Sequence, residues 1–353
     1  MFTASQVRNV IKRMSRGKSP GHDGLNKYLN LHDAQFGFRP GLSTESAILS
    51  LKHTVQYYTN RKTPVYACFL DLSKAFDLVS YDVLWRKMES RGIPAEILNI
   101  FRYLYANQLN FVKWSNKLSE AYRLECGVRQ GGLSSPKLFN LYVNDLIVEL
   151  SSMRVGCKVG GVSVNNISYA DDMVLLSPTA RAIGEMLNVC ENYAMTHGLV
   201  YNVKKSEYIF FKVAGKSPES IPPIYLSGVK LNRVFQFKYL GHILTDDLKD
   251  DLDVERERRA LAVRGNMLAR RMMMRLPRYC SASEMFAQRQ TDGFQAIVRK
   301  KVASLVRRVR ESGNSILRIV ADDIHAPILR HFMRTMNEIG SGSHGVPLRY
   351  MTQ

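Results

Sequence analysis

Apolar residues recur every three to four positions in several stretches of the chain, and this spacing predicts amphipathic helices. The stretches with this pattern are residues 3–14, 43–59, 80–92, 95–106, 136–150 and 179–197. Ser43 or Thr44 suits the N-cap of the second helix, and Gly198 suits the position after the last one. Pro136 fits the first turn of a helix.

Short apolar runs between these helices predict buried strands. The run VYACFLDL (65–72) is apolar and partly β-branched, and GVSVNNISYADDMVLL (161–176) indicates a strand, a tight turn and a second strand. FVKW and YRLECGV, within residues 111–128, are expected to pair with each other. Two further strand candidates are YNVKKSEYIFF (201–211) and VFQFKYLGHIL (234–244). This mixture of helices and strands predicts an α/β body over about residues 1–245.

The net charge of the chain indicates what kind of partner it binds. The 353 residues carry 50 Lys and Arg against 31 Asp and Glu, a net charge of +19. Such an excess favours a polyanionic partner, with nucleic acid ahead of an anionic membrane surface. Between Val254 and Arg310 there are 13 Arg and 2 Lys but only 4 acidic residues. We therefore expect a basic helical region after the α/β body.

Several classes of protein are excluded by what the chain lacks. The five cysteines are odd in number and none forms a C-x-x-C pair, which excludes a disulfide scaffold and a zinc knuckle built on cysteine pairs. The histidines form no H-E-x-x-H or H-x-x-x-H cluster typical of zinc hydrolases. The N-terminus has no apolar signal core, and no run approaches the roughly 18 apolar residues of a membrane span. We expect a chain of the nucleus or cytoplasm, neither secreted nor inserted in a membrane.

The adjacent acids Asp171 and Asp172 lie at the tip of the hairpin predicted over residues 161–176. Two-residue hairpin turns usually contain glycine, because the backbone there needs a positive φ. This tip instead offers Ala170 and two carboxylates that repel each other unless a cation binds. A functional site and an ordinary polar surface turn explain the tetrapeptide YADD equally well.

Asp71 changes that balance, because it ends the apolar strand VYACFL, where a charge is costly unless it is paired or bound to a metal. An acid at one strand end and an acid pair on a hairpin of the same sheet can converge on hard cations. Oxygen ligands suit Mg²⁺, and two-metal nucleotidyl transfer uses carboxylates in such an arrangement to hold its ions. The alternative is that Asp71 caps a helix after the strand.

Six sequence blocks occur in the order found in the reverse transcriptases of non-LTR (LINE-type) retrotransposons, which this chain resembles. The blocks are QFGFRPGLSTESAI (35–48) between fingers and palm, FLDLSKAFD (69–77) as motif A, GVRQGGLSSPKLFNLYVNDL (127–146) as motif B, YADD (169–172) as motif C, GLVYNVKKS (198–206) as motif D and FKYLGHIL (237–244) as motif E. The resemblance implies an α/β (α+β) fold with a right-hand polymerase palm, an antiparallel sheet and packed helices. The implied divisions are a partial fingers segment (1–64), the palm (65–245) and a basic helical thumb-like region (246–353).

The resemblance also implies a reaction, in which a primer 3′-OH attacks the α-phosphate of a dNTP with the help of Mg²⁺ or Mn²⁺ ions. Asp71, Asp171 and Asp172 match the metal-binding aspartates, and the backbone carbonyl of Leu72 would be a further ligand. Lys205 matches the motif D lysine proposed to protonate the leaving pyrophosphate. A simple charge partner or a solvated surface lysine are the alternatives for Lys205.

Three residues match positions near the incoming nucleotide. Phe76 matches the bulky residue that excludes a ribose 2′-OH, with a core aromatic as the alternative. Gln130 and Gly131 match the motif B turn near nucleotide and template, where glycine permits a close backbone approach. An ordinary turn from strand to helix is the alternative for this pair.

An RNA template and a DNA primer are the implied partners. Arg39 resembles a template-contacting arginine, with an internal ion pair as the alternative. Motif E resembles the primer grip, and the residues at its turn are Tyr239, Leu240 and Gly241. The thumb arginines expected to follow a nucleic-acid backbone are Arg259, Arg264, Arg270 and Arg271. A solvated helix face is the alternative for these arginines.

The chain departs from the family pattern in three places. Only residues 26–34 separate KSPGHDGL (18–25) from QFGFR, where relatives carry a longer fingers segment with basic residues that grip the triphosphate. Each such charge-assisted contact contributes roughly 1.5–3 kcal/mol. Ser134 replaces a usual Leu, and the basic segment LARRMMMRLPRYCSAS (268–283) lacks the intervening length expected of a thumb and linker. Two further hypotheses therefore stay open: a nucleic-acid-binding remnant without polymerase activity, and a product that does not fold stably.

Overall fold

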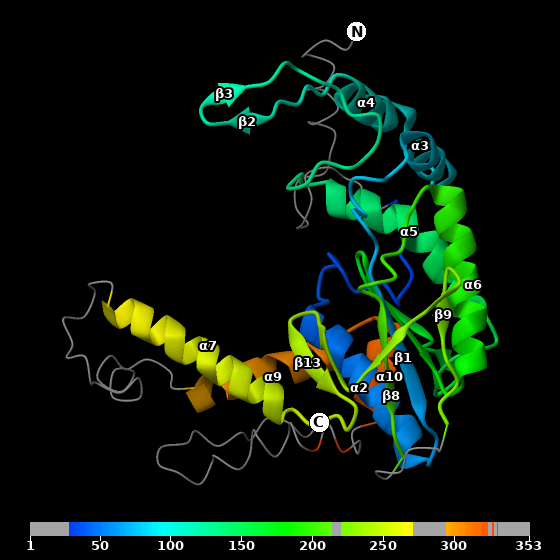
Figure 1. Cartoon of the computed structure of the whole chain (residues 1–353), viewed down its shortest axis with the longest axis vertical. Helices are drawn as coiled ribbons and strands as arrows, with labels where there is room; N and C mark the ends of the chain where they lie inside the picture. Colours follow the sequence, from blue (N-terminus) through cyan, green and yellow to red (C-terminus); the bar gives the residue numbers. More distant parts are fainter. Residues whose placement is uncertain (1–27, 214–219, 271–293, 324–326, 328–329, 331–353) are drawn as a thin grey trace.

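The computed structural model describes residues 28–213, 220–270, 294–323, 327 and 330 (Figure 1). Its centre is a five-stranded sheet in the order β11-β8-β1-β7-β6. The strands of this sheet are β1 Val65–Leu70, β6 Asn166–Tyr169, β7 Asp172–Ser177, β8 Glu207–Phe211 and β11 Asn232–Val234. β1 is antiparallel to both of its neighbours, whereas β11 joins β8 in parallel. An antiparallel-rich sheet with packed helices confirms the predicted α/β class.

The central strand β1 is buried along its whole length, which explains why its sequence is a continuous apolar run and not an alternating one. The helices of the body are α2 Thr44–Asn60, α3 Tyr81–Ser90, α4 Ala95–Ala106, α5 Ser135–Ser152 and α6 Ala180–His197. Both α2 and α6 contact β1, and α6 also packs on β7. These helices match the predicted ones closely.

The predicted helix ends are confirmed by their local chemistry. The Ser43 hydroxyl accepts a hydrogen bond from the Ser46 backbone N–H, and the Ser46 hydroxyl accepts one from the Ser43 N–H. This reciprocal capping box starts α2. Gly198 ends α6 with a φ of +67°, a conformation that favours glycine. The helix predicted over residues 3–14 lies outside the described residues.

The pairing predicted between FVKW and YRLECGV is wrong in detail. The hairpin here consists of β2 Lys113–Trp114 and β3 Lys117–Leu118. Ser115 and Asn116 form its turn with φ of +44° and +63°, so the chain reverses before the predicted second strand begins. Beyond the tip, the ladder continues only to a bridge between Asn110 and Tyr122.

Four short strands form two further hairpins beside the main sheet, and a third hairpin follows β11. The strands of the three hairpins are β4 Lys158–Val159, β5 Val162–Ser163, β9 Tyr225–Leu226, β10 Val229–Lys230, β12 Gln236–Tyr239 and β13 His242–Thr245. The β12–β13 hairpin is where VFQFKYLGHIL predicted a strand, and Phe237 from it stacks on Phe69 of β1 with ring centroids 4.3 Å apart. This stacking places the β12–β13 turn next to the end of β1.

The C-terminal part is helical where it is described. Its helices are α7 Asp251–Arg270, α9 Phe294–Arg310 and α10 Ser315–Asp322. Figure 1 shows that α7 projects away from the sheet, whereas α10 returns to α2. The buried residues Ile316, Leu317 and Val320 join the core, and the Ser315 N–H donates to the Asp33 carboxylate over 2.8 Å. None of the helices in the described ranges is both long and apolar enough to span a membrane.

Candidate active site

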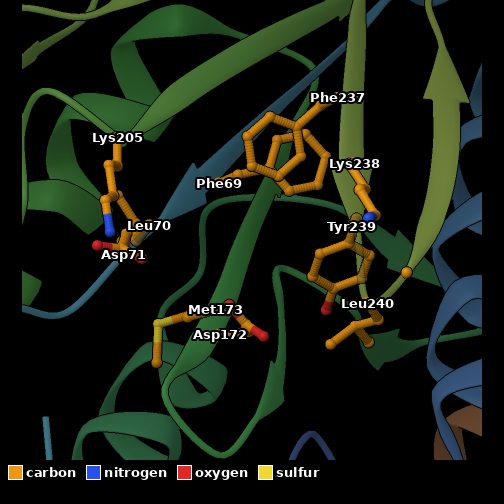
Figure 2. Close-up of a pocket in the computed structure, with 11 residues that line it drawn as sticks. Phe69, Leu70, Asp71, Asp172, Met173, Lys205, Phe237, Lys238, Tyr239 and Leu240 are labelled. Carbon is orange, nitrogen blue, oxygen red and sulfur yellow. The ribbon is translucent and has the colours of Figure 1, made fainter.

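The sheet register brings the predicted acids together. Leu70 of β1 pairs with Met173 of β7, so Asp71 and Asp172 are the next residues in the same antiparallel register. Both acids line a hollow of about 340 Å³. Figure 2 draws the side chains around it. The residues that line it are Phe69, Leu70, Asp71, Asp172, Met173, Lys205, Phe237, Lys238, Tyr239, Leu240 and Gly241. Residues from motif A, motif C, motif D and motif E thus share one site.

Backbone hydrogen bonds hold the end of β1 against the loop after α6. The Asp71 carbonyl accepts from the Asn202 N–H over 2.7 Å, and the Asp71 N–H donates to the Ser206 hydroxyl over 3.2 Å. Ser206 is buried, and its hydroxyl donates in turn to the Asn202 carbonyl over 2.9 Å. This loop therefore fixes the backbone from which the Asp71 carboxylate projects. The helix-cap alternative for Asp71 is wrong, since the next helix begins only at Tyr81.

Leu72 lies in the same connection, bridged to Tyr201. The hydrogen bonds of this bridge use the carbonyl of Asp71 and the N–H of Ser73, so the Leu72 carbonyl takes no part in it. Lys205 belongs to the loop after α6 and is exposed, and Figure 2 shows its amine directed toward Asp71. Its position suits either a proton donor or a charge partner at the hollow.

The acid pair lies at a two-residue hairpin tip. Tyr169 pairs with Asp172, which leaves Ala170 and Asp171 as the turn. Ala170 adopts a φ of +57°, a conformation that costs a residue with a Cβ about 1–2 kcal/mol. The tip thus keeps a strained backbone without glycine, as the sequence indicated.

The three carboxylates interact electrostatically. Burial raises the pKa of Asp171, and the charge of Asp71 adds to this effect. Although the Asp172 carboxylate reaches solvent, partial burial, then the charge of Asp171 and then that of Asp71 raise its pKa to about 6. Negative charges that raise the pKa of Asp171 and Asp172 define a position where a cation would be stabilised.

Tyr239 adds a polar group to the same hollow. Its side chain is buried, and its hydroxyl has no hydrogen-bond partner among the described residues. Burial raises the pKa of Tyr239, and the charge of Asp172 raises it further. Figure 2 shows the hydroxyl directed toward Asp172. Because an unpaired buried hydroxyl is costly, this group is suited to a ligand in the hollow.

The donor set fits a divalent cation only in part. Asp71 and Asp172 supply carboxylate oxygens to one hollow, but Asp171 does not line it. Among the residues that the structure describes, no group of three His, Cys, Asp or Glu side chains is placed to hold an ion. Two carboxylates nevertheless suit Mg²⁺, which usually takes one or two from the protein and the rest from waters and substrate phosphates. A metal site made of all three aspartates stays a prediction.

The residues expected to contact the incoming nucleotide lie around the start of α5. Phe76 is partly buried and stacks on the core residue Phe139, with ring centroids 4.9 Å apart and an interplanar angle of 13°. It is therefore packed as a core aromatic along one ring face. Gln130 is exposed and donates to the Asp77 carboxylate over 3.2 Å. Gly131 has a φ of +80° with open space where a Cβ would lie, so its backbone is accessible to a ligand.

Two of the arginines expected to bind nucleic acid, Arg39 and Arg259, pair with acids of the chain. The Arg39 guanidinium donates to the carbonyls of His32 and Gln35 and lies 3.6 Å from the Asp33 carboxylate, so the internal ion pair is what the structure contains. Arg259 of α7 bonds to Glu255 on the same helix over 2.7 Å.

The structure says less about the other arginines expected in a thumb-like region. Arg264 is exposed. The side chain of Arg270 and the whole of Arg271 lie outside the described residues.

Sequence reasoning missed three residues that hold the site in place, Gln35, Asn202 and Ser206. Gln35 is fully buried, and its side-chain oxygen accepts from the Ala170 N–H at the hairpin tip over 3.0 Å. All three lie inside the recognised sequence blocks, but no spacing rule connects them with the aspartates. Charged residues stand close to each of them in the sequence, so their place inside these blocks is the signal that the sequence offered.

Comparisons with known proteins identify the relatives of this chain. Residues 22–244 match the family described as reverse transcriptase (RNA-dependent DNA polymerase). Among curated relatives, the retrovirus-related Pol polyprotein from the type-2 retrotransposable element R2DM of Drosophila melanogaster is 30% identical over 230 residues, 62% of this chain and 21% of that protein. The probable RNA-directed DNA polymerase from transposon BS of Drosophila melanogaster is 29% identical over 218 residues, 60% of this chain and 23% of that protein. The chain thus spans less than a quarter of the length of these two relatives.

Among solved structures, telomerase from Candida tropicalis in complex with a fragment of telomeric RNA aligns with a TM-score of 0.47 and 12% identity, covering 97% of this chain and 48% of that one. This looser likeness carries no part of the assignment, which rests on the family match over most of the chain. The chain belongs to the reverse transcriptase (RNA-dependent DNA polymerase) family, and its relatives include the Pol proteins of non-LTR retrotransposons.

Proposed function

We propose that this chain is the polymerase part of a non-LTR retrotransposon protein and extends a DNA primer on an RNA template with dNTPs. The observation that carries the proposal is the shared hollow, in which Asp71 and Asp172 meet through the register of β1 and β7. We further propose residues 1–64 as partial fingers, 65–245 as palm and 246–353 as a thumb-like region.

In this proposal, some residues of the hollow hold the metal ions and others position the primer and the leaving group. Asp71 and Asp172, with Asp171 beside them and the Leu72 carbonyl as a further oxygen ligand, would hold Mg²⁺ or Mn²⁺ together with the phosphates of the substrate. Bound ions would lower the pKa of the primer 3′-OH and neutralise the triphosphate and the leaving group. The chain itself needs no side-chain nucleophile for this reaction.

Lys205 lies at the rim of the hollow, where its ammonium group can donate a proton or a charge-assisted hydrogen bond to a leaving pyrophosphate. The turn of the β12–β13 hairpin, with Tyr239, Leu240 and Gly241, borders the same hollow and is suited to hold the primer end. Phe76 and the exposed turn at Gln130 and Gly131 would contact the incoming nucleotide. In this scheme Arg39 supports the local fold and does not contact the template.

Primer extension on an RNA template tests the proposal. Purified chain is compared with Asp172→Asn, Asp171→Ala and the control Asp82→Asn, which changes an exposed acid in the first turn of α3. We expect incorporation by the unmodified chain and the control in Mg²⁺ or Mn²⁺, and a loss of at least about 100-fold in both site variants, since electrostatic groups at a reacting centre contribute about 3–4 kcal/mol. Equal incorporation by all four proteins would refute the assignment of the site.

The same experiment separates the proposal from its alternative, a nucleic-acid-binding remnant. The exposed Arg264 and the positive charge of the C-terminal helices favour binding whatever the chemistry. Salt-sensitive binding of an RNA–DNA primer–template without any incorporation by the unmodified chain would support the remnant.

A further inference from the structure

Gln35 is a buried side chain that touches the tip of the acidic hairpin. Its side-chain oxygen accepts two backbone hydrogen bonds, from the Ala170 N–H over 3.0 Å and from the Gly37 N–H over 2.9 Å. The amide orientation follows from chemistry, because a flipped amide would place its own NH₂ group against these two donors. The Gln35 Nε2 group is buried and has no partner among the described residues.

The segment around Gln35 runs beside β6 like an additional short strand. The Phe36 N–H donates to the Ser168 carbonyl over 2.7 Å, and the Ser168 N–H donates to the Ala34 carbonyl over 2.8 Å. A Cβ on Gly37 would lie only 2.5 Å from the Ala170 nitrogen, so this close approach requires glycine. On the far side, the Asn140 amide of α5 donates to the Gly37 carbonyl over 2.7 Å. The hairpin tip is therefore held by a framework outside the main sheet.

The tip has two physical reasons to relax without such a framework. Ala170 keeps a left-handed backbone that costs about 1–2 kcal/mol, and the adjacent carboxylates of Asp171 and Asp172 repel each other. A fully buried amide with one unpaired NH₂ group is itself costly, but an apolar residue at position 35 would leave the Ala170 and Gly37 N–H groups without this acceptor. The oxygen of Gln35 explains the presence of the amide, because it satisfies the N–H of the strained residue.

We propose that Gln35 is a positioning residue, whose side-chain oxygen fixes the hairpin tip and thereby the direction of the Asp171 and Asp172 carboxylates. This inference rests on the proposed polymerase function. Gln35 acts through the Ala170 backbone and does not itself contact substrate. Removing its oxygen should lower the rate of the chemical step and leave nucleotide binding largely unchanged, because misplacement by about 1 Å can cost about 100-fold in rate.

Four variants of the full chain test the proposal. Gln35→Met removes the oxygen at similar volume, Gln35→Asn withdraws it by one methylene group, and Gln35→Glu keeps an oxygen in place. The control is Asn144→Met. Asn144 is equally buried, its oxygen accepts from the His32 N–H over 2.8 Å, and its Nδ2 group also has no partner in the described part of the chain, but it does not touch the hairpin.

The expected result is a split between kcat and KM in primer extension. Gln35→Met and Gln35→Asn should lose at least about tenfold in kcat with the KM for dNTP within about twofold, and Gln35→Glu should stay within about threefold in kcat. Asn144→Met should keep its kcat even though it loses a comparable buried hydrogen bond. Loss of kcat by Asn144→Met to the same extent, or full kcat in Gln35→Met, would overturn the proposal. If Gln35→Met shows no cooperative melting transition, Gln35→Asn decides in its place.

Hydrogen exchange gives a readout that does not depend on activity. The Ala170 amide should exchange faster in Gln35→Met than in the unmodified chain, and its exchange in Asn144→Met should be unchanged. Unchanged protection of Ala170 in folded Gln35→Met would refute the contact on which the inference stands. The proposed function fails separately, if Asp172→Asn incorporates nucleotide as fast as the unmodified chain.

Discussion

The ion pair between Lys52 and Asp250 should be energetically asymmetric. Lys52 of α2 is 5% exposed, and its ammonium contacts the Asp250 carboxylate just before α7. The side chain of Asp250 is 37% exposed and also meets the His242 ring over 3.2 Å. Replacing one partner therefore leaves a buried cation in one case and a partly solvated anion in the other.

The magnitude follows from this difference in burial. Asp250→Asn strands the buried Lys52 ammonium, and an uncompensated buried charge costs about 3–5 kcal/mol. Lys52→Met leaves Asp250 in contact with water and His242, so we expect it to lower the free energy of unfolding by only about 1 kcal/mol. The double variant removes both charges and should recover most of the loss of Asp250→Asn.

A double-mutant cycle measures these values. The free energy of unfolding is obtained for the four proteins by urea denaturation at pH 7, followed by circular dichroism. A second series tests the acid range. Burial opposes the ionisation of Asp250, but the His242 hydrogen bond and the Lys52 charge outweigh it and lower the pKa of Asp250 to about 2. The stability that this lowered pKa contributes is present above about pH 4 and is lost as the pH falls toward 2.

Two outcomes would refute this reasoning. Lys52→Met could cost as much as Asp250→Asn, which would mean that burial does not decide the asymmetry. Alternatively, the losses of the two single variants could simply add in the double variant, which would mean that the two charges are not coupled.

Three further predictions concern the candidate active site. The pKa of Asp172, about 6, lies above its ordinary value, so ionisation of this carboxyl removes stability as the pH rises from that ordinary value toward 6. Asp172→Asn should therefore raise Tm by about 1–2 °C at pH 8, allowing for solvent exposure, and by less at pH 4.5. Equal shifts of Tm at both pH values would contradict this prediction. Ser206→Ala should slow primer extension and lower the free energy of unfolding by about 1–3 kcal/mol, because it leaves the partly buried N–H of Asp71 without its acceptor. Ser206→Cys, with a weaker acceptor, should fall between. Phe76→Ala should increase ribonucleotide incorporation relative to dNTP incorporation. It should also lower the free energy of unfolding by about 3 kcal/mol, because the stacking on Phe139 is lost. Unchanged sugar selectivity in a folded variant would show that Phe76 is a core aromatic only.

Local sequence predicted the elements of this protein well wherever the deciding interactions are local. The apolar run of β1, the capping box at Ser43 and the left-handed Gly198 each depend on neighbours within a few residues. The hairpin at Ser115 and Asn116 was misplaced because FVKW and YRLECGV have the strand pattern, while the turn residues lie between them.

The chain by itself determined which residues can carry the chemistry: an acid after a buried strand, an acid pair on a strained tip and the six blocks that relate it to a known family. Only the tertiary structure decided which groups meet. The register of Leu70 with Met173 brings Asp71 next to Asp172, although about 100 residues separate them in the sequence. Gln35 contacts the hairpin tip from another segment, and Arg39 forms an ion pair with Asp33. Partner choice over such separations depends on strand pairing and packing, and no local pattern contains that information.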